Sequence, residues 1–320
     1  MILSTQRISE RLQSYRGVTL RAPMRSLSAK DRLVLASRDV ATDMNNFHLL
    51  HYRRIDGFLV TAKNSGTHWL KYMLSHALAN ELGLPPPLHA SGRTANDYVG
   101  HPKWPHKYAQ APRIGSSHNL PSSILAWRPV FNALKLPPIV VLVRDIEQAM
   151  LSHYVKWRGE SGLSLSDYVH VPPPGRKSVA DIWWYINFFN RWGRMAAKFP
   201  DKILVVRYEE IRRDQNDWLT RIQRHYNLSL SPRSIEVGVA ASRREEMRSK
   251  LDPNAGELII PADHDRRVAR FSPEDQAHLR AVLAENLKYS FGYDYGLTAR
   301  RAAADASEWG SGSSRRSELR

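Results

Sequence analysis

The chain has 320 residues, of which 42% are hydrophobic and nine are Trp, enough for a folded core and too many for a wholly disordered protein. It contains no cysteine, which excludes disulfides, thiolate metal sites and cysteine nucleophiles. Its 47 Lys and Arg outnumber 31 Asp and Glu, so the net charge of +16 favours an anionic ligand, nucleic acid or an anionic membrane surface.

The distribution of apolar residues along the sequence gives an expectation about where the protein acts. No stretch approaches the roughly 20 uninterrupted apolar residues that span a bilayer, and the N-terminus lacks the apolar core of a secretory signal. We therefore expect a cytoplasmic protein, with peripheral contact to an anionic membrane as a further use of its charge. Residues 1–54 are predicted to form a basic arm or flap, and residues 297–320 a mobile low-complexity tail.

The first elements in chain order are a strand, a helix and a loop. An apolar run at residues 55–61 predicts a buried strand, and apolar residues at three- and four-residue steps from Leu70 to Leu82 predict a helix. The segment 84–111, rich in Pro and His, predicts a long surface loop, which in compact domains is often a binding lid.

The remaining elements continue the alternation of strands and helices. The β-branched run at 138–143 is typical of a parallel strand that is covered on both faces. The pattern predicts a single α/β domain over residues 55–296, with a central parallel sheet flanked by helices. The other elements predicted are strands at 113–117 and 202–206, helices at 146–157, 179–199, 214–226 and 272–288, and a loop at 159–177.

A short polar loop follows the first strand and leads into the first helix. Such a loop presents free N–H groups and the positive end of a helix dipole, which suits a phosphate. Gly66 lets the backbone approach an anion, Ser65 and Thr67 add hydroxyl donors, and Lys63 adds a charge. The alternative is an ordinary strand–helix turn with a Ser/Thr cap. The loop does not fit a Walker A motif, which disfavours a kinase that uses ATP and Mg²⁺.

A second motif follows the strand at 138–143. Arg144 ends this strand, and Ser152 lies eight residues later in the next helix. A forked guanidinium and a hydroxyl in these places can converge on one phosphate. The alternative is a surface pair between Arg144 and Asp145 and an ordinary helix serine.

Together the two motifs resemble those of the sulfotransferases that use 3′-phosphoadenosine 5′-phosphosulfate (PAPS). In that family a Lys-Ser-Gly-Thr-Thr-Trp loop wraps the 5′-phosphosulfate, and an Arg with a Ser-x-Tyr motif binds the 3′-phosphate. Here the loop reads KNSGTHW over residues 63–69, so His68 replaces the second Thr and Trp69 is retained to stack on adenine. Asn64 stands at the family's Lys. Either Lys63, one position earlier, reaches the bridging oxygen, or Asn64 contacts that oxygen more weakly than the family's Lys does.

The segment from Arg113 to Pro121 resembles the part of the family that carries the catalytic His before Leu-Pro. His118 keeps the five-residue distance from Arg113, while Asn119 is inserted before Leu-Pro. Ser116 stands where many members have an active-site Lys.

Other matches are local. Tyr208 lies in a strand-end segment that resembles the family's adenine contact, and Ser242 lies where an adenine or phosphate contact is often found. Arg266 and Arg267 occupy the place of the Arg-Lys-Gly segment that closes over the 3′-phosphate. The face formed by Trp184, Phe188 and Trp192 resembles the family's aromatic helix, although core packing is the favoured interpretation.

The resemblance implies a P-loop-like fold that transfers a sulfuryl group from PAPS to a hydroxyl or amine, without a metal. It implies that His118 is the catalytic base and that Lys63 stabilises the leaving phosphate oxygen. The acceptor we expect is a carbohydrate or glycolipid. The donor-site residues that it implies are Lys63, Asn64, Ser65, Gly66, Thr67, His68, Trp69, Arg144, Ser152, Tyr208, Ser242, Arg266 and Arg267.

Two other functions stay open from the sequence. One is a P-loop kinase of a small metabolite, which the missing Walker A motif disfavours. The other is a basic, non-enzymatic nucleic-acid-binding protein, suggested by a pI near 10.1. No recognisable nucleic-acid-binding module is present, so nucleic acid is not an expected partner.

Overall fold

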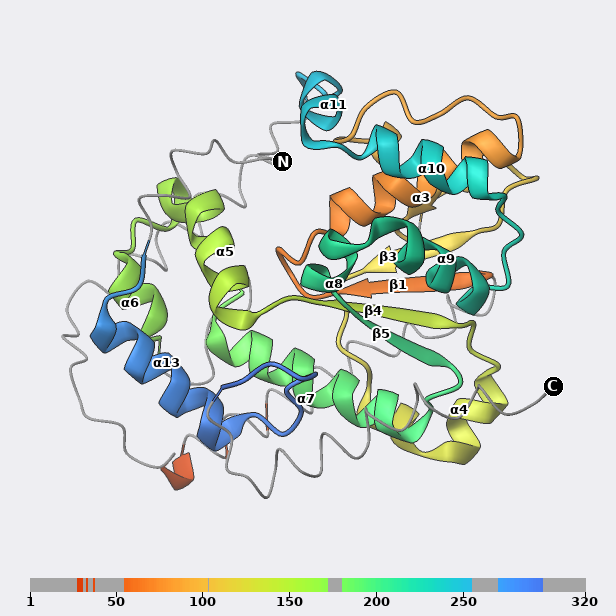
Figure 1. Cartoon of the computed structure of the whole chain (residues 1–320). Coiled ribbons are helices and arrows are strands. Elements are labelled where there is room, and N and C mark those ends of the chain that lie inside the picture. Colours follow the sequence, from red (N-terminus) through yellow and green to blue (C-terminus); the bar gives the residue numbers. More distant parts are fainter. Residues whose placement is uncertain are drawn as a thin grey trace.

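A parallel five-stranded sheet in the order β2-β3-β1-β4-β5 forms the centre of the computed structural model (Figure 1). The structure describes residues 28–30, 33, 37, 55–102, 104–171, 180–254 and 270–295. The strands are β1 (Gly57–Thr61), β2 (Val99–Gly100), β3 (Ile114–Ser117), β4 (Ile139–Val143) and β5 (Ile203–Arg207).

Helices connect the strands and cover the sheet. The longer ones are α3 (Thr67–Glu81), α5 (Ile146–Ser161), α7 (Ile182–Lys198), α9 (Gln215–His225), α10 (Pro232–Ala241) and α13 (Pro273–Asn286). The shorter ones are α4 (Arg128–Leu134), α6 (Leu165–Val169), α8 (Tyr208–Arg213), α11 (Arg244–Ser249) and the single turns η2 (Thr94–Asn96) and η3 (Ser123–Ala126).

The strand side chains alternate between two separate cores. Val60 and Val141 pack with the aromatic residues of α7, whereas Leu59 and Val140 pack with apolar residues of α3, α9 and α10. This alternation follows from the two-residue repeat of a strand. Figure 1 shows α3 and α10 on one face of the sheet and α7 on the other. The prediction of one α/β domain around a doubly covered parallel sheet is confirmed.

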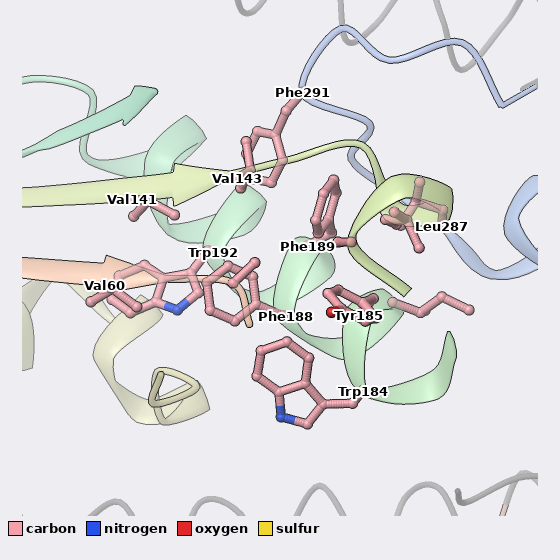
Figure 2. Packing of buried hydrophobic residues seen from close by; sticks show 14 of the residues in the cluster. Val60, Val141, Val143, Trp184, Tyr185, Phe188, Phe189, Trp192, Leu287 and Phe291 are labelled. Atoms are coloured by element: carbon pink, nitrogen blue, oxygen red, sulfur yellow. The ribbon is translucent and has the colours of Figure 1, made fainter. Parts of the chain in front are cut away.

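Helix α7 supplies a large aromatic group to the core on its side of the sheet (Figure 2), namely Trp183, Trp184, Tyr185, Phe188, Phe189 and Trp192. It begins after Asp181, whose side chain accepts a hydrogen bond from the backbone N–H of Trp184 at 3.0 Å and so caps the helix. The solvent-exposed fractions of Trp184, Phe188 and Trp192 are only 7%, 0% and 3%. Core packing is therefore the main role of this face.

Two predicted loops contain regular structure that the sequence did not indicate. In the loop expected at 159–177, α5 continues to Ser161 and α6 covers Leu165–Val169. Ser164 starts α6 by accepting from the N–H of Asp167, a cap that binary hydrophobic patterning does not reveal.

The segment 84–111 is also more ordered than a surface loop. Val99 is buried, and β2 pairs with β3 as a two-residue edge strand. A strand this short leaves no alternating pattern to detect.

The predicted arm at 1–54, except residues 28–30, 33 and 37, and the predicted tail at 297–320 lie outside the described residues. Among the helices that the structure describes, none combines the length and the apolar character needed to cross a membrane.

Candidate functional site

The predicted functional residues follow the carboxyl ends of adjacent parallel strands. The loop 62–66 follows β1, His118 follows β3, Arg144 follows β4 and Tyr208 follows β5. In open α/β sheets this edge is where ligands bind, because the strand ends and the following helix N-termini face the same space.

The loop after β1 makes a tight turn into α3. Asn64 and Gly66 have left-handed φ angles of 57° and 92°. No side chain caps the N-terminus of α3, and its first turn contains no acidic residue. Its N–H groups and positive dipole end are thus not neutralised by side chains of the helix itself.

Arg144 links this loop to Ser152 in α5. Arg144 Nη1 donates to Ser152 Oγ at 3.0 Å and to the backbone carbonyl of Asn64 at 3.1 Å. The guanidinium also lies 4.9 Å from the centre of the Tyr208 ring. Three separate chain segments therefore meet at one charged side chain.

Several buried polar atoms here lack a partner within the described chain. They include Ser65 Oγ, His68 Nδ1 and Arg144 Nε. Because buried polar groups are normally hydrogen-bonded, such a group of atoms within one site is characteristic of a place that a polar ligand completes.

Trp69, Tyr208 and Ser242 also come together. The rings of Trp69 and Tyr208 meet edge to face, with centroids 5.4 Å apart, and Trp69 Nε1 donates to the Ser242 carbonyl at 3.1 Å. The Ser242 hydroxyl instead donates to Val239 O at 2.9 Å and is buried. Ser242 therefore takes part through its backbone, which fixes the Trp69 ring.

The side chains of Lys63 and Asn64 have different surroundings. Lys63 Nζ lies 5.2 Å from the Trp184 ring centre, and burial lowers the Lys63 pKa while the charge of Asp181 acts in the opposite direction. The Lys63 carbonyl accepts from Tyr185 Oη at 2.9 Å. Asn64 is held by its own contact to α5.

That contact is with His153. The backbone N–H of Ala180 donates to His153 Nε2 at 3.3 Å, and His153 Nδ1 lies 2.7 Å from the Asn64 side-chain amide. Burial, with the charges of Lys63 and Lys156, lowers the pKa of His153 to about 3, so the ring is neutral. The Asn64 atom in this contact is Nδ2, so the amide group is held against α5 by the His153 ring.

His118 has its ring orientation fixed by the end of β1. Its Nδ1 lies 2.8 Å from the Thr61 carbonyl and 3.0 Å from the Thr61 hydroxyl, which also contacts the hydroxyl of Thr67 at 2.8 Å. A carbonyl only accepts, so Nδ1 carries the proton and Nε2 of the neutral ring carries a lone pair.

The charge state of His118 is set by its surroundings. The residue as a whole is exposed to solvent, while its Nδ1 is held against the end of β1. Desolvation lowers its pKa to about 4, the Thr61 hydrogen bond partly opposes this, and the charges of Lys63, Lys71 and Lys156 add to it. At neutral pH the ring is therefore uncharged, and its Nε2 is an acceptor.

The chain after His118 is held by α7. Trp192 Nε1 donates to the Asn119 carbonyl at 3.0 Å, and Arg191 Nη1 donates to the Pro121 carbonyl at 2.8 Å. The inserted Asn119 is thus accommodated by an aromatic side chain that also packs in the core.

Some predicted residues are not part of this assembly as described. Arg266 and Arg267 lie outside the described residues. Ser116 is buried within β3. Within the ranges that the structure describes, no group of three or more His, Asp or Glu side chains is arranged to hold a metal ion.

Sequence reasoning missed four residues that shape the site: Thr61, His153, Asp181 and Tyr185. Asp181 had a detectable signal, because an acidic residue before an apolar helix is typical of an N-cap. The other three lie within apolar or helical patterns, and only the tertiary structure shows what their polar atoms contact.

Comparison with known proteins gives the family. The model of the sulfotransferase domain matches residues 54–272, more than half of the chain. No curated protein matches the chain.

Solved structures with a similar fold include the mouse sulfotransferase SULT7A1 complexed with PAP, at 17% identity and a TM-score of 0.48, covering 76% of this chain and 90% of that one. A retinol dehydratase in complex with androsterone and inactive cofactor PAP has 15% identity and a TM-score of 0.43, covering 72% and 80%. A putative steroid sulphotransferase of Arabidopsis thaliana has 18% identity and a TM-score of 0.43, covering 75% and 85%. On the strength of the domain match, the chain belongs to the sulfotransferase family.

Proposed function

We propose that this sulfotransferase takes its sulfuryl group from PAPS and transfers it to a hydroxyl or amine. The observation that carries the donor assignment is the junction at Arg144, which joins Ser152, the loop carbonyl of Asn64 and the Tyr208 ring. A cation between a phosphate-type loop and an aromatic ring suits a nucleotide with two separate phosphate groups.

In this proposal the loop and its neighbours bind the two ends of the donor. Ser65, Gly66, Thr67 and His68 receive the 5′-phosphosulfate, with the N-terminus of α3 supplying N–H groups and positive potential. Arg144 and Ser152 receive the 3′-phosphate. Trp69 and Tyr208, with the backbone of Ser242, receive the adenine; Arg266 and Arg267 stay predicted contacts of the 3′-phosphate.

Lys63, rather than Asn64, is proposed to stabilise the leaving phosphate oxygen. The Asn64 amide contacts His153 at 2.7 Å. The Lys63 ammonium instead lies over the Trp184 ring, 5.2 Å from its centre. A cation–π contact leaves the donor hydrogens of an ammonium available to an anion.

His118 is the proposed base. Its Nε2 takes the proton of the acceptor hydroxyl or amine as the acceptor atom forms its bond to sulfur. The bond from sulfur to the bridging oxygen breaks, and that oxygen leaves with adenosine 3′,5′-bisphosphate (PAP). Catalysis then depends on alignment and on charge stabilisation by Lys63 and the helix dipole.

A carbohydrate or glycolipid remains our proposed acceptor. Trp104 is half exposed, its ring is in contact with His101, and both lie in the segment 84–111 that we propose to border the acceptor. Exposed aromatic rings of this kind offer a flat apolar face with a polar edge, which suits a sugar. A screen with labelled PAPS against sugars, glycolipids and phenols tests this, and sulfation of phenols alone would contradict it.

The donor assignment is tested by calorimetric titration with PAP, and with ATP and Mg²⁺ as the comparison. We expect saturable binding of PAP and weaker binding of ATP. Absence of PAP binding, or a preference for ATP with Mg²⁺, would overturn the proposal and return the P-loop kinase as the leading alternative.

Gly66→Ala is expected to weaken PAP binding and to lower the free energy of unfolding by about 1–3 kcal/mol, the usual cost of a strained backbone conformation. An added Cβ would lie 2.7 Å from Tyr208 Cδ2, and φ at this residue is +92°. The matched control is Gly83→Ala, at φ +62° with no atom within 4 Å of the added Cβ. Equal effects of the two substitutions on PAP affinity, measured by calorimetry, would argue against the close approach of Gly66 and Tyr208 to the ligand.

A further inference from the structure

The C-terminal segment 290–295 is attached to the ends of two central strands. The hydroxyl of Tyr295 accepts from the backbone N–H of Ile146, the first residue of α5, at 2.9 Å. The carbonyl of Gly292 accepts from Arg207 Nη1, at the end of β5, at 3.3 Å. A segment distant in sequence thus fixes the place where β4 and β5 turn into their helices.

A carboxylate between these strand ends extends the connection. Glu209 Oε1 accepts from the backbone N–H of Asp145 at 3.2 Å, and Glu209 Oε2 accepts from Tyr293 Oη at 2.5 Å. The Tyr293 ring also lies 5.5 Å from the Arg207 guanidinium. Glu209 therefore joins the β4 end, the β5 end and the C-terminal segment.

Apolar packing supports the same arrangement. Figure 2 shows Phe291 of the segment near Val143 and Phe189, and the Phe189 and Phe291 ring centroids lie 5.0 Å apart. The hydrogen bonds are thus formed at the border of a packed core, where displacements are small.

The residues so held are the immediate neighbours of the proposed nucleotide contacts. Arg144 precedes Asp145, and Tyr208 precedes Glu209. Since peptide units are planar and consecutive Cα atoms are about 3.8 Å apart, fixing Asp145 and Glu209 fixes the spacing from which the Arg144 and Tyr208 side chains start. Those side chains lie 4.9 Å apart, from guanidinium carbon to ring centre.

We propose that Glu209 and Tyr293 are positioning residues, which set the distance between Arg144 and Tyr208 and thereby the preference of the site for nucleotides with a 3′-phosphate. This rests on the proposed donor site and adds the residues that keep it selective. Neither residue needs to touch the ligand.

The test compares two probes, PAP and adenosine 5′-monophosphate, by calorimetry in the full chain. Tyr293→Phe removes the Oη–Glu209 bond and keeps the ring against Arg207. We expect PAP affinity to fall about three- to tenfold, the net worth of about one hydrogen bond, with affinity for the monophosphate unchanged. The PAP preference should therefore fall by the same factor.

The control is Tyr98→Phe, which removes a hydroxyl bonded to the Pro85 carbonyl at 2.6 Å beside β2, at the opposite edge of the sheet. It should leave the PAP preference unchanged. Equal weakening of both nucleotides by Tyr293→Phe, or no weakening, overturns the inference while leaving the donor site standing. If the unaltered protein itself has no preference for PAP, the proposed function fails, and the inference fails with it.

Discussion

Replacing His118 with asparagine is expected to lower kcat by a factor of about 10²–10⁴, the usual contribution of a positioned general base. The amide nitrogen of asparagine can take the place of Nδ1, which contacts the Thr61 carbonyl at 2.8 Å. The substitution therefore keeps the local hydrogen bond and removes Nε2. PAP affinity should not change, because the proposed donor contacts lie elsewhere.

A matched histidine gives the control for this measurement. His225 contacts the Ile139 and Lys202 carbonyls through Nε2 at 3.0 Å and 3.2 Å, at the amino ends of β4 and β5. His225→Gln places an amide nitrogen near Nε2, and it should leave kcat unchanged. Near-normal turnover of His118→Asn with normal PAP binding would show that another group takes the proton.

The pH dependence of kcat/KM in the unaltered enzyme gives a second check on His118. Its pKa is lowered to about 4, so the ring becomes protonated, and unable to act as a base, only as the pH falls through that value. The acid limb of the profile should therefore lie near pH 4 instead of near the usual histidine value of about 6.5. An acid limb between pH 6 and 7 (about the ordinary histidine range) would contradict this.

Stability must be followed over the same pH range. His68, His118 and His153 all have lowered pKa values in the folded protein, mainly through burial. Below about pH 6.5 the unfolded chain binds more protons at these rings, so the free energy of unfolding falls as the pH falls. Tryptophan fluorescence at each pH separates unfolding from titration of the base.

The sequence predicted the sheet well because its strands carry a strong signal. The run at 138–143 is apolar throughout and became β4, buried on both faces. β2 escaped detection because it is two residues long, and α6 because it lies between polar segments. Elements whose stability comes from tertiary contacts leave little trace in local pattern.

The site was predictable where strand ends and spacing determine it. The eight-residue step from Arg144 to Ser152 predicted that the two side chains could reach one phosphate, and in the structure they lie within hydrogen-bond distance of each other. Their role with a nucleotide stays a proposal. The different surroundings of Lys63 and Asn64 could not be predicted from the sequence, because Asn64 contacts His153, 89 residues away along the chain.

Arg144→Met is expected to weaken PAP binding at least about 100-fold, because hydrogen bonds to a charged group are each worth about 1.5–3 kcal/mol and two would be lost from the 3′-phosphate. Binding of adenosine 5′-monophosphate should change far less, since it lacks that phosphate. Calorimetry with both nucleotides measures the difference. A loss shared equally by both would show that Arg144 acts mainly by supporting the loop through the Asn64 carbonyl, which it contacts at 3.1 Å.

Ser152→Ala separates these two roles further. The Ser152 hydroxyl accepts from Arg144 at 3.0 Å, whereas the loop carbonyl of Asn64 is contacted by Arg144 itself. If both side chains hold the same phosphate, Ser152→Ala should weaken PAP binding by up to about tenfold alone and by much less in the Arg144→Met background, since residues in one hydrogen-bond network do not contribute additively. Additive effects would mean that the two side chains act on PAP independently. In that case Arg144 and Ser152 would not share one phosphate, and the proposal that they hold the 3′-phosphate together would be contradicted.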